Sequence, residues 1–287
     1  MPADYKAELV GVLGQPVAEN PTGAMQEAAF AAAGLNWRYL TMEVPPAQLA
    51  RAVEGLRALG FRGFNLTIPH KVAVMPYLDD VAAEARMIGA VNTVRREGDR
   101  FIGENTDGKG FLRGLRLDAG VDPRGKRVVV LGAGGAARAI ATEIGLAEAG
   151  EITVVNRSEA RGRGMTEDLR RNLACPIRLL PWNGTYMVPE GIDILVNATS
   201  IGLFPDVHSM PAVDLAHASA GMLVCDAVFN PPETRLLAAA RERGLPTLDG
   251  LSMLVYQGVI GFEIWTGRTA PEQVMKAALR EALTGGA

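Results

Sequence analysis

Short apolar runs alternate with longer amphipathic stretches along the first half of the chain. The runs have the length and composition of strands, and the stretches between them have the spacing of helices, bounded by glycine or proline. The expected strands are residues 9–13, 38–44 and 61–68. The expected helices are residues 23–34 and 45–60, with further helical patterns around residues 72–87 and a hairpin-like stretch after them. This order predicts an α/β unit.

The second half repeats the alternation with more continuous apolar runs, which are typical of strands buried on both faces of a parallel sheet. These runs are residues 127–132, 151–157, 192–200, 222–229 and 245–250. Two helical patterns close the chain, and the first of them reads GLSMLVYQGVIGFEIWTG. We therefore expect an α/β protein with two units rather than one.

Composition and charge narrow the kinds of partner. The chain has 287 residues, of which 48% are hydrophobic and 21% are charged, which suits a soluble protein with two modest domains. Its formal net charge is -3, so the chain offers no broad cationic surface to a nucleic acid backbone. We expect a small-molecule partner and no nucleic acid.

The cysteines and the N-terminal stretch favour a cytoplasmic protein. Cys175 and Cys225 stand in mostly apolar surroundings without metal-ligand spacing, as reduced and buried thiols do. Asp4 and Glu8 interrupt the N-terminal stretch where a secretory signal needs a continuous apolar region. No segment offers about 18 apolar residues without a charge, so we expect no membrane span either.

A glycine-rich turn, VVVLGAGGAARAIA, joins the first strand of the second half to an alanine-rich helix. Gly132, Gly134 and Gly135, with Ala133 and Ala136 beside them, allow a tight turn and the close approach of a pyrophosphate to the helix N-terminus. Three glycines alone are a weak signal. The strand before them and the helix after them favour a dinucleotide-binding loop over a simple turn.

The end of the next strand indicates which dinucleotide binds. An NAD site usually presents Asp or Glu to the ribose at this point. This chain has Asn156, Arg157 and Ser158 there, followed by Arg161. Two guanidinium groups and a hydroxyl can hold a 2′-phosphate through charge-assisted hydrogen bonds. We therefore expect NADP; NAD stays as the alternative, and Arg161 is alternatively an exposed helix residue.

Lys71 ends the stretch NLTIPHK, where an apolar strand stops at a proline, a histidine and a charged amine. Asn92 and Asp107 stand in two other polar stretches, GAVNTV and GENTDGKGF. A lysine–aspartate pair can move the hydroxyl proton of a carbinol without a metal, and the three histidines show no ligand spacing. The alternatives are a solvated lysine, turn residues at Asn92 and Asp107, and a packing role for His70.

These stretches resemble the shikimate dehydrogenase family almost from end to end. The matching motifs are NLTIPHK, GAVNTV, NTDGKGF, GAGGAARA, NRSEAR, NATSIGL, DAVFNP, TRLLAAARERG and GLSMLVYQGVIGFEIWTG. The resemblance implies an α/β substrate domain at residues 1–108, completed by helices at 248–287, a doubly wound Rossmann domain at 109–247, and a cleft between them. It also implies an NADP-dependent oxidoreductase that interconverts shikimate and 3-dehydroshikimate in aromatic amino acid biosynthesis.

The resemblance further implies the roles of individual residues. Lys71 and Asp107 would be the catalytic pair. The substrate-binding residues would be Asn20, Thr22, Thr67, Asn92, Phe229 and Gln257. Besides the glycine turn and the strand end, the cofactor would be lined by Thr199, Val228, Gly250 and Met253. Phe229 stands where the family commonly has a tyrosine, so we expect one hydroxyl contact to be missing.

The loop within residues 14–30 departs from the family pattern. Asn20 and Thr22 stand where a Ser-x-Ser pair usually grips the substrate carboxylate, and Glu19 and Gly23 replace a histidine and a proline. We therefore expect weak binding of shikimate, with quinate, aminoshikimate or another ring polyol as alternative substrates. A non-catalytic binding protein and a methylene-tetrahydrofolate-type dehydrogenase are two further hypotheses for the function. The sequence leaves both a monomer and a homodimer open.

Overall fold

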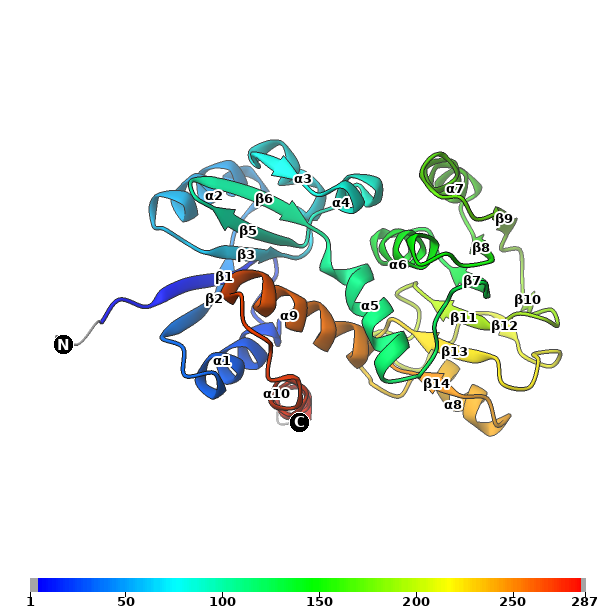
Figure 1. Cartoon of the computed structure of the whole chain (residues 1–287). Helices are drawn as coiled ribbons and strands as arrows, with labels where there is room; N and C mark the ends of the chain where they lie inside the picture. Colours follow the sequence, from blue (N-terminus) through cyan, green and yellow to red (C-terminus); the bar gives the residue numbers. More distant parts are fainter. Residues whose placement is uncertain (1–4, 285–287) are drawn as a thin grey trace. The chain divides into compact units, whose positions relative to one another are not determined.

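Strands and helices alternate through the computed structural model, which describes residues 5–284 (Figure 1). Asp4, one of the two charged residues that argue against a secretory signal in the N-terminal stretch, lies outside the described residues. The elements form two compact units: unit 1 runs to Thr106 and resumes at Gln257, and unit 2 is Asp107–Tyr256. The chain passes between the units at the start of α5 (Thr106–Leu117) and within α9 (Gly250–Thr266).

The first turns of α9 group with unit 2, although the sequence places the boundary at residue 247. Asp118, directly after α5, explains the grouping. Its carboxylate accepts hydrogen bonds from the Ser252 hydroxyl at 2.5 Å and from the Tyr256 hydroxyl at 2.9 Å. The start of α9 is therefore attached to the end of α5 within unit 2.

Unit 1 contains a mixed six-stranded sheet in the order β2-β1-β3-β5-β6-β4. The strands are β1 (Glu8–Gly14), β2 (Trp37–Glu43), β3 (Gly63–Leu66), β4 (Asp80–Val81), β5 (Thr93–Glu97) and β6 (Arg100–Glu104). β1 is parallel to β2 and β3, whereas β5 is antiparallel to both β3 and β6. The expected hairpin is therefore β5 and β6, and the three expected strands are β1, β2 and β3.

Helices cover the sheet of unit 1 and close its core. They are α1 (Thr22–Ala32), α2 (Leu49–Ala58), α3 (His70–Ala73), α4 (Ala83–Ile88), α10 (Glu272–Thr284), the second part of α9, and the 3₁₀ turns η1 (Pro46–Gln48) and η2 (Met75–Tyr77). Phe30 of α1 stacks on Phe262 of α9 with ring centroids 5.6 Å apart. Phe64 and Phe101 meet edge to face at 5.2 Å. Aromatic side chains thus fill much of this core.

The helical pattern around residues 72–87 is interrupted in the structure. α3 ends at Ala73, a 3₁₀ turn with proline in its first turn follows, and β4 separates it from α4. A proline in the middle of a helix removes a backbone donor and clashes with the preceding turn. Pro76 therefore explains why no single helix spans this stretch.

Unit 2 contains a parallel six-stranded sheet in the order β14-β13-β11-β7-β8-β9. The strands are β7 (Arg127–Leu131), β8 (Glu151–Asn156), β9 (Ile177–Pro181), β11 (Ile194–Asn197), β13 (Leu223–Asp226) and β14 (Thr247–Leu248); β10 (Tyr186–Met187) and β12 (Val213–Asp214) pair separately. This is the doubly wound Rossmann order, in which the order of the strands reverses between β7 and β11. Ligands of such sheets bind at the carboxyl ends of the strands near that point.

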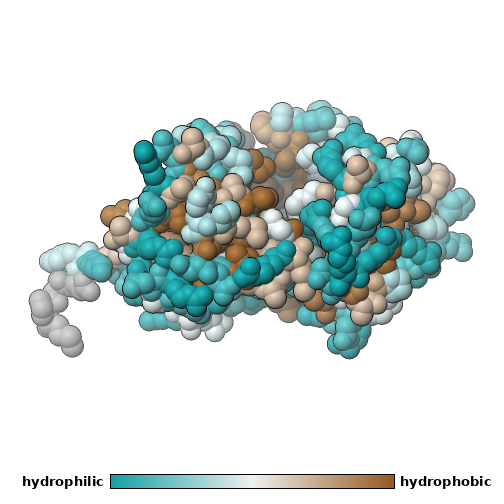
Figure 2. Space-filling model, turned by 90° about the horizontal axis from the view of Figure 1, so that it is seen from above, coloured by the Kyte–Doolittle hydropathy of each residue, from teal (hydrophilic) through white to brown (hydrophobic). Residues whose placement is uncertain are grey.

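The helices of unit 2 are α5, α6 (Gly135–Leu146), α7 (Glu159–Asn172) and α8 (Arg235–Glu242). Ser158 caps α7 and Thr234 caps α8, each by accepting a backbone N–H with its hydroxyl oxygen. Figure 2 shows hydrophilic side chains over much of the face in view, with hydrophobic ones between them. Within residues 5–284, no helix is both long and apolar enough to cross a membrane.

Candidate active site

Lys71 lies just beyond the carboxyl end of β3, on the short helix α3, and its side chain is half-buried. Two backbone hydrogen bonds hold the segment: Thr67 N–H donates to Leu13 at 3.0 Å, and the Lys71 carbonyl accepts Val91 N–H at 2.8 Å. The position of Lys71 is therefore fixed beside the residue that precedes Asn92. Two of the predicted site residues, Thr67 and Lys71, therefore both lie just beyond the carboxyl end of β3.

His70, the neighbour of Lys71, is a packing residue. Its side chain is fully buried, and Nε2 donates a hydrogen bond to the Val44 carbonyl at 2.7 Å. Nδ1 is buried and has no hydrogen-bond partner among residues 5–284. The ring therefore fastens α3 to the segment after β2, which supports the packing alternative for His70.

Asn92 is buried and ties the β5–β6 hairpin to the start of α5. Its Oδ1 accepts the Thr106 backbone N–H at 2.7 Å, and its Nδ2 donates to the Thr106 hydroxyl at 3.0 Å. Asp107, half-buried in the first turn of α5, directly follows Thr106. A carboxylate in the first turn of a helix is stabilised by the helix dipole. Asn92 thus fixes the chain at the point from which Asp107 begins unit 2.

A buried polar network continues from Asn92 into the sheet. Thr106 and Thr93 share a hydroxyl hydrogen bond at 3.0 Å, and Asn65 Nδ2 donates to Thr93 at 2.9 Å. Tyr39 donates its hydroxyl to Asn65 Oδ1 at 2.7 Å, and burial raises the pKa of Tyr39 well above its ordinary value. The sequence did not single out these residues as a network. The available signal was Asn65, an asparagine inside a fully buried strand.

The remaining predicted substrate residues occupy both units. Asn20 and Thr22 lie at the start of α1, where Asn20 Oδ1 accepts the Thr22 backbone N–H at 3.0 Å. Gln257 lies in the part of α9 that belongs to unit 1, with 6% of its surface exposed. Phe229, by contrast, is half-buried just after β13 in unit 2. Asn20, Thr22, Thr67, Lys71, Asn92 and Gln257 therefore lie in unit 1, and Asp107 and Phe229 lie in unit 2.

The glycine turn after β7 has the geometry of an anion site. Gly132 has φ +106°, and a Cβ there would stand 3.1 Å from the Ala198 carbonyl oxygen and the Thr199 methyl, so glycine is required. A Cβ at Gly134 or Gly135 would meet no atom within 4 Å. The N-terminus of α6 also lacks a side-chain cap. The backbone N–H groups there fit a pyrophosphate.

Arg157 and Arg161 present two guanidinium groups at the end of β8. Both side chains are exposed, and neither makes a hydrogen bond or ion pair within residues 5–284. Ser158 caps α7, since its Oγ accepts Arg161 N–H at 3.4 Å, and Asn156 Nδ2 donates to the Ser158 carbonyl at 2.7 Å. The strand end thus offers two uncompensated cations on an ordered turn, which fits a 2′-phosphate.

Thr199 is held by a network at the carboxyl ends of β11 and β13. Its hydroxyl donates to Asn197 Oδ1 at 2.7 Å and accepts Ile201 N–H at 3.1 Å. Asn197 Nδ2 in turn donates to Asp226 Oδ1 at 2.9 Å. Because the Thr199 hydroxyl is used inside the loop, its methyl and backbone are what it presents towards the glycine turn.

Asp226 lies at the centre of that network and was not predicted from the sequence. It also accepts Val228 N–H at 3.0 Å and the Thr234 hydroxyl at 2.7 Å. Desolvation raises the pKa of Asp226 to about 6, against the lowering effect of these hydrogen bonds. Nearby, a Cβ at Gly250 would lie 2.3 Å from the Val228 carbonyl oxygen, so glycine lets α9 begin against this segment. Met253 follows one turn later and packs at the edge of the unit 2 core.

The buried carboxylate predicts a pH-dependent stability. The folded-state pKa of Asp226 exceeds its ordinary value of 3.8, so the free energy of unfolding should fall as pH rises through about 4 to 6. The fall is on the order of 3 kcal/mol. Asp226→Asn should remove it, because the amide oxygen keeps the bonds from Asn197 and Val228 while Nδ2 donates to Thr234. Denaturant unfolding at several pH values measures the difference; parallel pH curves for the two proteins would contradict this assignment.

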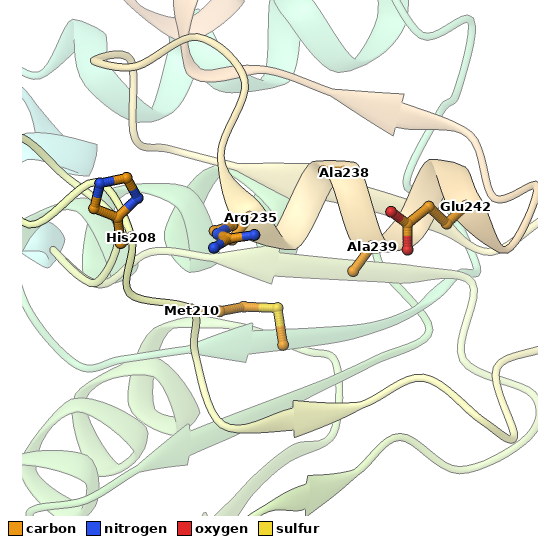
Figure 3. Close-up of a pocket in the computed structure, with 6 residues that line it drawn as sticks. All are labelled: His208, Met210, Arg235, Ala238, Ala239 and Glu242. Atoms are coloured by element: carbon orange, nitrogen blue, oxygen red, sulfur yellow. The ribbon is translucent and has the colours of Figure 1, made fainter.

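A separate hollow of about 310 Å³ lies on α8 and on the loop before β12 (Figure 3). Arg235 and Glu242 project from the helix, and His208 and Met210 come from the loop. None of the residues predicted from the sequence lines it. Within residues 5–284, no group of three or more His, Cys, Asp or Glu side chains is arranged to hold a metal ion.

Comparisons with known proteins cover nearly the whole chain. Family models match residues 12–94 (shikimate dehydrogenase substrate binding domain), 118–203 (shikimate / quinate 5-dehydrogenase) and 250–280 (shikimate 5′-dehydrogenase C-terminal domain). The curated shikimate dehydrogenase (NADP(+)) of Symbiobacterium thermophilum is 47% identical over 281 residues, which cover 96% of this chain and 95% of that protein.

Two solved structures have the same fold. The ligand-free 5-ketofructose reductase of Gluconobacter sp. strain CHM43 is 46% identical with a TM-score of 0.93, covering 97% of this chain and 99% of that one. The shikimate 5-dehydrogenase of Thermus thermophilus, in complex with NADP(H) and shikimate, is 36% identical with a TM-score of 0.85, covering 96% and 100%. The chain therefore belongs to the shikimate dehydrogenase family of NAD(P)-dependent oxidoreductases.

Proposed function

We propose that the protein is an NADP-dependent oxidoreductase that interconverts a ring carbinol and ketone of the shikimate and 3-dehydroshikimate type. The observation that carries this proposal is the placement of Lys71 at the carboxyl end of β3, with its backbone fixed to the residue before Asn92. Relatives with this family assignment are NADP-dependent shikimate dehydrogenases. These relatives support the proposal for this chain, in which Lys71 and Asp107 would bear the chemistry.

NADP(H) supplies or accepts the hydride when it is bound. Unit 2 offers the glycine turn and the N-terminus of α6 to the pyrophosphate, and Arg157 and Arg161 to the 2′-phosphate. Unit 1 offers Lys71 to the reacting oxygen. A positioned lysine can act as a general acid, so Lys71 can donate a proton as the ketone becomes an alcohol. In the reverse direction the hydroxyl proton goes to the neutral Lys71 amine, directly or by a relay through the Asp107 carboxylate.

Asn92 and the buried network behind it act by positioning. Asn92 is held by two hydrogen bonds to Thr106, and Thr106 is held by Thr93. Side chains that are locked in this way limit the error in position of the groups beside them. We infer that Asn92 and Gln257 bind ring hydroxyls, while Thr67 lines the same end of the sheet.

The direct test is NADPH oxidation in the presence of 3-dehydroshikimate, followed by the same assay with NADH. The proposal predicts turnover that depends on the ketone and favours NADPH. Binding of the ketone without any oxidation of NADPH would instead favour a non-catalytic binding protein on this fold.

One specific observation supports a second candidate substrate. The 5-ketofructose reductase from Gluconobacter is 46% identical to this chain, with a TM-score of 0.93. A keto sugar is an uncharged polyol ketone, and its reduction needs the same hydride and proton transfers. Reduction of 5-ketofructose is therefore the second candidate function, and quinate or aminoshikimate are further ring polyols to assay.

A further inference from the structure

The loop between β1 and α1, residues 15–21, lies beside the segment that carries Lys71. β1 and β3 are neighbouring parallel strands, and Gln15 N–H donates to the Ile68 carbonyl at 3.0 Å. Ligands of α/β sheets bind outside the carboxyl ends of such strands. A substrate that binds at the carboxyl ends of β1 and β3, next to Lys71, therefore has this loop and the start of α1 as its neighbours.

The Asn20 amide has a fixed orientation in this loop. Its Oδ1 accepts the Thr22 backbone N–H at 3.0 Å, and its own backbone N–H donates to Val17 at 3.0 Å. The free N–H groups of a helix N-terminus are the natural donors to an anion. Here the Asn20 side-chain oxygen already accepts the first of them, that of Thr22, so the Nδ2 group is the part of the Asn20 amide that remains to face a ligand.

Thr22 contributes a hydroxyl to this loop. Only 5% of the residue is exposed, but its hydroxyl makes no hydrogen bond within residues 5–284 and its oxygen is not completely buried. The hydroxyl is therefore open to a ligand. It can donate to a carboxylate or to a neutral group, and it can also accept from a ligand hydroxyl, which a carboxylate cannot offer.

The charges of this segment also disfavour an anion. Between Lys6 and Arg38 the sequence contains no lysine, arginine or histidine. The exposed carboxylate of Glu19 directly precedes Asn20. A substrate carboxylate at this end would therefore meet a like charge and find no cation on the loop or on α1.

We infer that residues 19–22 select an uncharged polyol ketone or alcohol over its carboxylate-bearing counterpart, with Asn20 and Thr22 as specificity-determining residues. The inference rests on the proposed function, because it concerns the substrate of the same site. The group that these residues recognise is a hydroxyl or another neutral group that both donates and accepts hydrogen bonds.

The sharpest test uses two alcohols that differ in charge and hardly in shape, shikimate and its carboxamide. Both are oxidised with NADP, and kcat/KM is compared; reduction of 5-ketofructose with NADPH is measured alongside. We expect the carboxamide to exceed shikimate at least tenfold in kcat/KM, which corresponds to about 1.4 kcal/mol. The difference should lie mainly in KM, because the loop is not expected to move a proton.

Variants of residues 19–22 test whether these residues cause the preference for the carboxamide. Glu19→Gln should reduce the preference for the carboxamide, and Glu19→His with Asn20→Ser and Thr22→Ser should raise kcat/KM for shikimate tenfold or more. Glu54→Gln, which removes an exposed carboxylate from α2 in the same unit, is the matched control and should change nothing. Thermal melting of each variant shows whether it is folded, and Glu19→Gln alters only an exposed side chain.

The outcomes separate the inference from the proposed function. Preference for the carboxamide, or turnover of 5-ketofructose with little turnover of shikimate, supports the inference. Equal or better use of shikimate, with no gain in the triple variant, overturns the inference and leaves the proposed function standing. Absence of NADP(H) turnover with all three compounds contradicts the proposed function itself.

Discussion

Replacing Lys71 with alanine is expected to lower kcat by roughly 10²–10⁴-fold while KM for the substrate changes by only a few-fold. In the proposed mechanism, Lys71 supplies the proton that the reacting oxygen gains when the ketone is reduced. The backbone of residue 71 is held by the Val91 N–H, so the truncation should leave the segment in place. Steady-state oxidation of NADPH at saturating ketone gives kcat directly.

Lys126→Ala is a matched control for that experiment. Lys126 is a lysine of unit 2 that pairs with Asp193 at 3.2 Å, so its loss removes a surface ion pair without touching the segment of Lys71. Its kcat should equal that of the unaltered protein. Near-normal turnover of Lys71→Ala, with unchanged melting temperature, would remove Lys71 from the mechanism.

Replacing Arg157 with alanine is expected to weaken NADP binding by about ten- to a hundred-fold and to leave NAD binding almost unchanged. Arg157 stands at the end of β8 without an ion pair or hydrogen bond within the described residues, so it is available to the 2′-phosphate. A hydrogen bond to a charged group contributes about 1.5–3 kcal/mol. That range gives the expected one to two decades in Kd.

Calorimetric titration of both dinucleotides measures the effect. Arg163→Ala is the control, because Arg163 lies on α7, shortly after Arg157 in the chain, but pairs with Glu159, and its loss should not alter either Kd. If the unaltered protein binds or uses NAD as well as NADP, the assignment of the strand end to a 2′-phosphate is wrong.

The parts of the fold that the sequence predicts best are those with strong local patterns. The valine-rich run of β7, the glycine turn and the alanine-rich α6 form one continuous stretch, and the structure contains all three in that order. The strand before Lys71 was also predicted, although β3 is shorter than the apolar run. In both places the residues that predict the element are consecutive in the chain, so the local pattern of apolar residues is sufficient to predict it.

The parts that the sequence did not predict depend on pairing between distant segments. Asn65 meets Thr93 because β3 and β5 pair antiparallel in that register, and no local pattern states which strands pair. Asp226 meets Asn197 because β11 and β13 are parallel neighbours. β9 was not predicted because it lies at the sheet edge with only Ile177 buried, so its apolar pattern is weak.

The Asn20 loop illustrates the same limit within the candidate site. Its residue types alone indicate a departure from the family pattern, and they leave the direction of the amide open. The hydrogen bond from Thr22 N–H to Oδ1 settles that direction and shows which group remains for a ligand. A chemical interpretation of the loop therefore needs the geometry as well as the sequence.

Hydride transfer from NADPH to a ketone, with a proton from Lys71, can be followed with NADPH that carries deuterium at both C4 positions. The protein is incubated with 3-dehydroshikimate and, separately, with 5-ketofructose. Mass spectrometry then measures the deuterium content of each alcohol product. We expect one deuterium in the product of at least one ketone, and we expect Lys71→Ala to form this product at least a hundred-fold more slowly. Oxidation of NADPH without deuterium in either product, or labelling by Lys71→Ala at the unaltered rate, would contradict this mechanism.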